Sequence, residues 1–156
     1  MRKTMIKIFL LAAFLTTWSV AVNAQQTTAK QTAEFDQLID RYFDSLNETD
    51  GKRRMELTKQ VWAENAIQYV FPDNEDKGYA EISRRSEKVQ KQNPGAAIRR
   101  TSKIELVRDN YIRFNWEFGK PGSEPIVSGV DFAIVVDGKL RLVTGFFDNK
   151  QSPAKN

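Results

Sequence analysis

Neither cysteine nor histidine occurs in the 156 residues of this chain. Their absence excludes disulfide bonds, catalytic triads that need histidine, and zinc sites built from thiolate or imidazole ligands. Three of the 24 basic residues and none of the 20 acidic residues lie in the first seven positions, which leaves 21 basic and 20 acidic residues in the remainder. A sequence so close to neutrality lacks the electrostatic footprint of nucleic-acid binding, so we expect no nucleic-acid partner.

The N-terminus has the pattern of a secretory signal peptide. A basic start is followed by a largely apolar run, Ile8 to Val22, and by small residues ending at Ala24. This order is typical of a cleaved signal, and the run is short for a transmembrane helix. We predict a signal peptide over residues 1–24, a flexible leader over 25–32, and an exported protein, periplasmic or secreted, with no membrane contact after cleavage. An uncleaved membrane anchor is the alternative.

Three amphipathic helices are predicted in the first half of the remaining chain. In the first, apolar side chains recur at helical spacing, which places them on one face: Phe35, Leu38, Ile39, Tyr42, Phe43 and Leu46. A second helix is expected over residues 52–64. A third is expected over 79–91, closed by Pro94-Gly95.

Strands dominate the second half of the chain. Residues 111–119 alternate between apolar and polar side chains, as a half-buried strand does, and Asp137-Gly138 is a strong signal for a two-residue hairpin turn. The expected strands cover residues 66–71, 98–108, 111–119, 126–136 and 140–147, with a polar loop at 73–77 and a turn at 109–110. Helices that precede an antiparallel sheet indicate a single α+β domain, which we place at residues 33–149, followed by a flexible tail at 150–156.

Several short segments follow one another along the chain in this order: Arg41-Tyr42-Phe43, Trp62-Ala63-Glu64-Asn65-Ala66, Gly78-Tyr79, Pro94-Gly95, Arg113 to Gly119, Gly129-Val130-Asp131-Phe132, Asp137 to Leu140 and Val143 to Asp148. In this order and spacing they resemble the nuclear transport factor 2-like (SnoaL-like) superfamily, whose fold is a cone of three helices packed on a curved, mostly antiparallel sheet. The superfamily includes ketosteroid isomerases, polyketide cyclases, dehydratases and non-catalytic binding modules, so the fold alone does not fix the function.

The resemblance implies roles for two residues. Tyr42 matches a tyrosine on the first helix of the isomerases, and Asp131 matches a late-strand aspartic acid; together these form an oxyanion hole there. The isomerase base is expected just before the proline that ends the first strand. Here residues 68–72 contain no carboxylate, so proton abstraction lacks its expected base.

Asp131 is the strongest candidate from the residues themselves. It interrupts a strand of Val, Phe, Ala and Ile, where an acid is costly unless it is satisfied, and burial there would raise its pKa. The alternatives are a carboxyl held by backbone groups or by Arg100 as a structural pair. Tyr42 is either a donor in a pocket or a core residue whose hydroxyl needs a partner.

The aromatic residues Trp62, Tyr69, Phe71, Phe114 and Trp116 are the candidate lining of a pocket for a flat or apolar ligand, or else ordinary core. Arg100 shares strand parity with Ile104 and Leu106, so it either points toward that pocket or, after a register slip of one residue, toward solvent. We expect no cofactor and no metal.

Three functions remain open on this basis. The first is an exported domain with a pocket for a small, largely apolar molecule, without established catalysis. The second is an isomerase, cyclase or lyase in which Tyr42 and Asp131 stabilise an oxyanion. The third is an interaction module that forms a homodimer through the outer face of its sheet. Convergence of the Tyr42 hydroxyl and the Asp131 carboxyl on a cavity would favour the second.

Overall fold

The computed structural model describes residues 29–70 and 74–148, which fall into two units that divide between Glu34 and Phe35. The predicted signal peptide, the first part of the predicted leader, Phe71 and the predicted tail lie outside the described residues. In the first unit, residues 29–34 are helical, with an ion pair of 3.9 Å between Lys30 and Glu34 one turn apart. The flexible leader expected up to residue 32 is therefore helical from residue 29.

Three helices lie in the described part of the second unit. The first helix continues to residue 47 and buries the apolar stripe that its spacing predicted. Next is α2, Gly51–Val61, which begins where the Asp50 carboxylate accepts the Arg53 backbone N–H at 2.7 Å as an N-cap. It ends three residues earlier than predicted because the backbone at Trp62 is already extended. Helix α3, Gly78–Gln92, matches its prediction within one residue at each end.

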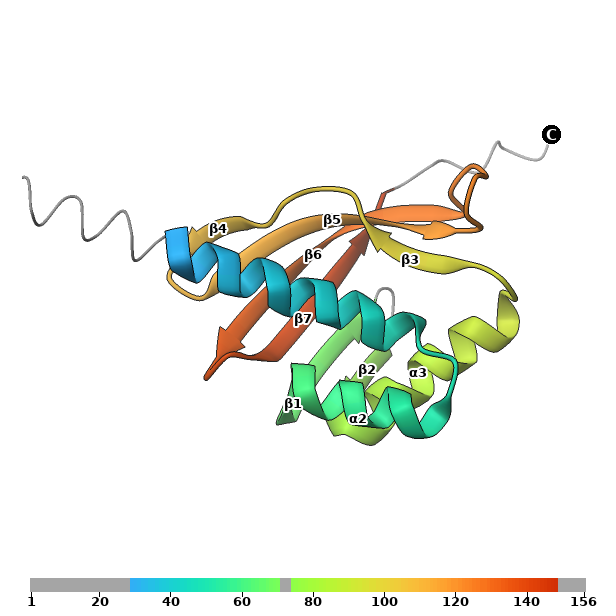
Figure 1. Cartoon of the computed structure of the whole chain (residues 1–156), viewed down its shortest axis with the longest axis horizontal. Coiled ribbons are helices and arrows are strands. Elements are labelled where there is room, and N and C mark those ends of the chain that lie inside the picture. The colour runs from blue at the N-terminus through green and yellow to red at the C-terminus, as the bar shows by residue number, and fades with distance from the viewer. Residues whose placement is uncertain (1–28, 71–73, 149–156) are drawn as a thin grey trace, which may run out of the picture. The chain divides into compact units, whose positions relative to one another are not determined.

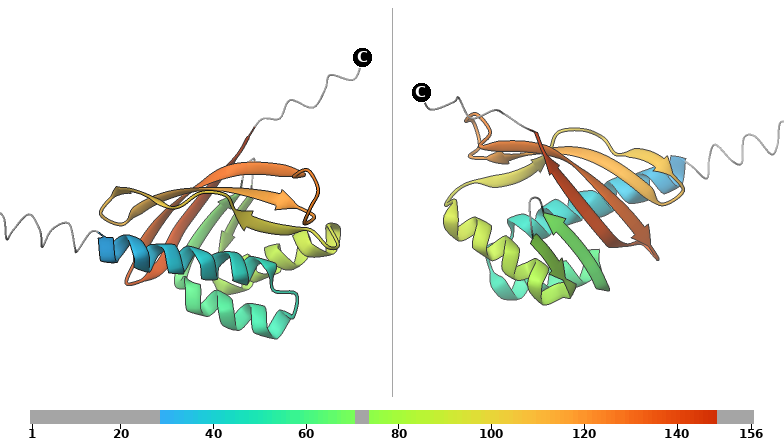
Figure 2. Two further views of the ribbon diagram at one scale, coloured as in Figure 1. Left: turned by 45° about the horizontal axis from the view of Figure 1, so that its top comes forward. Right: turned by 180° about the vertical axis from the view of Figure 1, so that it is seen from behind.

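The strands form one seven-stranded sheet, in the order β2-β1-β7-β6-β5-β3, with β4 also pairing with β5. Their bounds are β1 Trp62–Val70, β2 Asn74–Lys77, β3 Ala97–Arg100, β4 Glu105–Arg108, β5 Tyr111–Gly119, β6 Val127–Val136 and β7 Lys139–Phe147. All pairs are antiparallel except β1 with β7, which are parallel. Figures 1 and 2 show the curved sheet with the helices on its concave side. This confirms the predicted α+β class.

Two predicted segments differ from the structure. The polar residues 74–77 form strand β2 at the sheet edge, where Asp76 pairs in register with Gln68. The single strand predicted over 98–108 is two strands, because the backbone pairing with β5 is interrupted at residue 102. There the Ser102 hydroxyl, in place of a backbone carbonyl, accepts the hydrogen bond of the Asn115 backbone N–H at 2.9 Å. The Asp137-Gly138 turn is as predicted, with φ of 51° and 72° at its two residues. Positive φ at both positions is the geometry of a type I′ hairpin turn.

The core lies between the first helix and the concave face of the sheet. Tyr42 and Phe43 of the helix make edge-to-face contacts with the Phe114 ring, at centroid distances of 6.0 and 5.7 Å. Trp62 joins the same cluster, 5.6 Å from the Tyr42 ring. These contacts fix the first helix against β5 and the start of β1, and so determine which side chains meet beneath it.

Candidate functional site

Two side chains from different elements donate hydrogen bonds to the carboxyl group of Asp131 on β6. The Tyr42 hydroxyl, from the first helix, donates to Oδ2 at 3.1 Å. The indole Nε1 of Trp116, from β5, donates to Oδ1 at 2.6 Å. All three side chains meet on the concave side of the sheet. Side chains alternate between the two faces of a strand, and Trp116 on β5 and Asp131 on the neighbouring β6 both lie at inward positions, while Tyr42 lies on the buried stripe of its helix.

Burial determines how this group ionises. Asp131 is only 4% exposed, and removal from water raises the pKa of its carboxyl to about 7, although the hydrogen bonds from Trp116 and Tyr42 act in the opposite direction. Burial, followed by the negative charge of Asp131, raises the pKa of Tyr42 well above its usual value of 10. At neutral pH the phenol is therefore protonated, and Asp131 is close to the midpoint between its acid and its carboxylate.

Two glycines make room for this arrangement. Gly145 lies opposite Asp131 on β7, and a Cβ atom there would be 2.8 Å from Asp131 Oδ1. Gly129 lies opposite Trp116, and a Cβ atom there would be 2.7 Å from the indole ring. Sequence reasoning missed both as site residues, although the Gly129-to-Asp131 spacing already placed a glycine and an acid on the same face of one strand.

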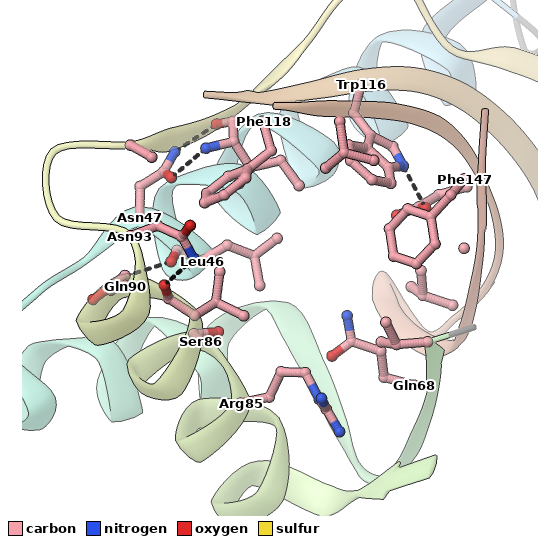
Figure 3. Close-up of a pocket in the computed structure, with 18 of the residues that line it drawn as sticks. Leu46, Asn47, Gln68, Arg85, Ser86, Gln90, Asn93, Trp116, Phe118 and Phe147 are labelled. Carbon is pink, nitrogen blue, oxygen red and sulfur yellow. Dashed lines mark hydrogen bonds between the residues drawn. The ribbon is translucent and has the colours of Figure 1, made fainter. Parts of the chain in front are cut away.

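The carboxyl lies at the wall of a partly open cavity of about 360 Å³. This is within the range of small-molecule sites, which are mostly apolar with a few placed polar groups. Its apolar lining comes from Leu46, Val89, Ile98, Phe118, Val127, Val143 and Phe147. Figure 3 labels Leu46, Phe118 and Phe147 of this lining, together with polar side chains such as those of Gln68 and Arg85, around the open space. Asp131 is the only carboxylate among the described residues that line the cavity.

The predicted lining is present only in part. Tyr42, Trp116 and Asp131 line the cavity, and so does Tyr69, which is nevertheless 40% exposed and whose hydroxyl donates to Glu75. Trp62 and Phe114 lie in the core instead, because their rings pack against the first helix. Phe71 lies outside the described residues.

The prediction that Arg100 lies at the pocket or pairs with Asp131 is wrong. Arg100 is opposite Trp116 in register and so faces the helical side, as its parity indicated. Its guanidinium, however, forms ion pairs with Asp36 and, at 2.9 Å, with Asp40. These carboxylates are one turn apart on the first helix and hold Arg100 at that helix, away from the cavity lining.

Sequence reasoning missed several polar residues of the cavity. Gln68 lies in the segment 68–72 where a base was expected, and its Oε1 has no hydrogen-bond partner among the described residues. Arg85 of α3 lines the opposite side and forms a two-point ion pair with Asp76. Asn47 holds the rim, since its amide exchanges two hydrogen bonds with the Ile98 backbone, at 2.7 and 2.9 Å.

Two further features concern the described residues only. Within residues 29–70 and 74–148, no group of three or more Asp or Glu side chains could hold a metal ion. Over the same ranges, no helix is long and apolar enough to cross a membrane.

Comparison with known proteins gave matches among solved structures alone, since neither a family model nor a curated protein matched the chain. A candidate isomerase of the SnoaL-like family from Agrobacterium tumefaciens is 26% identical, with a TM-score of 0.67, over 74% of this chain and 98% of that one. A candidate ketosteroid isomerase from Kribbella flavida is 22% identical, with a TM-score of 0.58, over 80% and 84%. A candidate polyketide cyclase from Sinorhizobium meliloti is 15% identical, with a TM-score of 0.57, over 74% and 98%. The last two, at such low identity, indicate a shared fold only.

Proposed function

The chain has the nuclear transport factor 2-like (SnoaL-like) fold, and from this premise we propose that it is an exported domain that binds a small, largely apolar molecule in the cavity beside Asp131. The single observation that carries the proposal is the Asp131 carboxyl, buried in the wall of an apolar cavity and held there by Tyr42 and Trp116. A carboxyl in such a place costs stability, and a polar group of a ligand would find in it a pre-positioned partner.

Binding without chemistry accounts best for the rest of the lining. Proton abstraction needs a group that can take up a proton near the substrate. Gln68, in the segment where that group was expected, has a carboxamide, which does not titrate. With Asp131 as the only carboxylate among the described lining residues, a second carboxylate that could serve as the base is missing there.

An isomerase, cyclase or lyase is the second candidate, and one specific observation favours it. The Tyr42 hydroxyl and the Asp131 carboxyl lie 3.1 Å apart at the cavity, within the reach that acid–base or oxyanion chemistry needs. The 26%-identical candidate isomerase supports the same interpretation. In this function the protonated Asp131 and Tyr42 would polarise a carbonyl or phenol oxygen, while water or another base would move the proton.

Native mass spectrometry of the protein purified from its own cell envelope tests the binding function. We expect a co-purifying small molecule whose mass is lost in Val89→Trp, which fills the cavity from α3. Lys88→Trp is the matched control, since Lys88 is exposed on the same helix and does not line the cavity. A protein that carries no molecule, and that fails to bind small aromatic probes in titration, would refute the proposal. Turnover of a bound ketone that requires Asp131 would instead establish the second candidate.

Export is part of the proposal and rests on the N-terminal sequence pattern. We expect the mature protein to begin near Gln25 and to be recovered outside the cytoplasm. N-terminal sequencing of the protein from its native envelope tests this, and an intact Met1 in the membrane fraction would contradict it.

A further inference from the structure

Arg85 binds Asp76 through one edge of its guanidinium and has the other edge free to donate hydrogen bonds. From α3 it donates through Nε and, at 3.1 Å, through Nη2 to the two carboxylate oxygens of Asp76 on β2. The pair is largely shielded, with side chains 21% and 12% exposed. The remaining nitrogen, Nη1, has no hydrogen-bond partner among the described residues. Arg85 also lines the cavity, so the two N–H groups of Nη1 are donors that a bound molecule can use.

The Arg85–Asp76 pair and the Asp131 group are on different sides of the cavity. Asp76 is on β2 and Asp131 is on β6, and two strands, β1 and β7, separate them in the sheet. Three strand spacings correspond to about 14 Å between the backbones. Figure 3 shows Arg85 on the side of the cavity opposite Trp116, the residue that holds Asp131. Apolar side chains, Val143 of β7 and Val89 of α3 among them, line the space between.

The charges of the two groups define what each can recognise. The guanidinium of Arg85 is already offset by Asp76, so a second carboxylate would bring two negative charges to one cation in a partly buried place. An uncharged carbonyl oxygen accepts from Nη1 without that cost. At the other end, the Asp131 carboxyl accepts hydrogen bonds from two donors. With a pKa of about 7 it is partly ionised at neutral pH, so it can also accept a hydrogen bond from a hydroxyl group of a ligand.

We propose that the cavity takes a two-ended ligand: a flat apolar body with a hydroxyl group at Asp131 and an uncharged carbonyl oxygen at Arg85. This inference rests on the proposed binding function and names the chemical class of its ligand. The apolar body fills the space between the two polar ends, and the spacing of the ends selects the length of the molecule.

Three fluorescent probes separate the ends. 2-Naphthol has only the hydroxyl, 6-acetyl-2-naphthol adds a carbonyl at the far end, and 6-hydroxy-2-naphthoate adds a carboxylate there. In fluorescence titrations of the wild-type protein we expect the acetyl probe to bind about tenfold more tightly than 2-naphthol, the gain of one hydrogen bond from a charged donor. The carboxylate probe should have no such advantage.

Variants of Arg85 and Asp76 test whether Arg85 causes the tighter binding of the acetyl probe. In Arg85→Met combined with Asp76→Asn, which leaves neither charge buried alone, the acetyl and plain probes should bind equally. Asp76→Asn by itself should keep the preference. Arg84→Met is the matched control, because its side chain is 69% exposed and pairs with Glu81. If the double variant fails to fold, Arg85→Lys serves instead: it keeps a charge beside Asp76 but lacks the second arm of the guanidinium, and it too should lose the preference.

The outcomes distinguish the two levels of the proposal. If both naphthols bind the wild-type protein equally and Arg85 variants change nothing, the two-ended ligand is wrong and the binding function stands. If the carboxylate probe binds most tightly and does so through Arg85, the uncharged carbonyl is overturned in favour of an anion. If no probe binds at all, the apolar binding function fails and this inference fails with it.

Discussion

Replacing Asp131 by Asn should raise the free energy of unfolding relative to the wild type at neutral pH. This advantage over the wild type should disappear in acid. The sign follows from proton binding. Between pH 3.8, the usual pKa of the carboxyl, and about 7, its pKa in the folded protein, the folded chain holds a proton that the unfolded chain does not. Raising the pH through this window therefore favours unfolding, with a slope of about 1.4 kcal/mol per pH unit. Over roughly three pH units the wild type loses about 4 kcal/mol, and above pH 7 the loss is complete.

The carboxamide of Asn does not titrate, so the difference between the two proteins isolates this one group. Asn also has the shape of Asp and keeps an oxygen that can accept from Trp116 or Tyr42. We expect the free energy of unfolding of Asp131→Asn, minus that of the wild type, to rise by about 4 kcal/mol between pH 4 and pH 8. Urea denaturation at half-unit pH steps measures it.

Glu56→Gln is the control for the loss of one charge, since Glu56 is exposed on α2. Two parallel profiles for the wild type and Asp131→Asn across pH 4–8 would refute the reasoning, because the carboxyl would then ionise alike in the folded and unfolded chains. Asp131→Leu supplies a second comparison. It leaves the Tyr42 hydroxyl and the Trp116 indole N–H without their acceptor, at about 1–3 kcal/mol each.

Three shorter predictions follow from other contacts. Gly145→Ala should push the Asp131 carboxyl away from its donors and weaken 2-naphthol binding about tenfold in fluorescence titration, the equivalent of one lost hydrogen bond; unchanged affinity would mean that the glycine is not needed for room. Arg100→Met should lower stability by about 1 kcal/mol, as loss of a partly exposed ion pair does, without changing probe affinity, and a large loss of affinity would return this residue to the site. A homodimer through the outer face of the sheet stays a prediction, and it would bury Phe132 and Phe146, which are 37% and 52% exposed there. Analytical ultracentrifugation tests it: we expect a dimer for the wild type and a monomer for Phe132→Lys, and a wild type that is monomeric at every concentration would rule this homodimer out.

Much of the fold could be predicted because its periodicities are strong. The stripe on the first helix, the alternation of residues 111–119 and the Asp137-Gly138 turn each have one physical solution, and the structure has those solutions. Strand β2 was missed because Asn74–Lys77 has no apolar residue. Its pairing depends on partners elsewhere, Arg85 for Asp76 and Tyr69 for Glu75, and no local pattern reports them.

The sequence predicted the part of the site around Asp131, but not the part around Gln68. Asp131 stood out because one carboxyl interrupts an apolar strand, and Tyr42 because it lies on a buried stripe. On β1, hydrophobicity favoured Tyr69 over its neighbour Gln68 as an inward residue. The register with β7 decides otherwise: Gln68 pairs with Val143, which is buried, and Tyr69 pairs with Thr144. Register across a parallel pair is a tertiary property, which the sequence of one strand does not contain.

The place of β7 in the sheet has a consequence for how the chain matures. This last strand of the fold lies between β1 and β6, and it alone joins the β1–β2 hairpin to the rest of the sheet. A chain that emerges from its N-terminus completes all three helices and six strands before the strand that unites them exists. Until then the β1–β2 hairpin lacks its pairing with the rest of the sheet. Unpaired strand edges favour aggregation, and long-range strand pairing is intrinsically slow. A nascent chain stopped before residue 139 therefore lacks the strand that unites the two parts of the sheet.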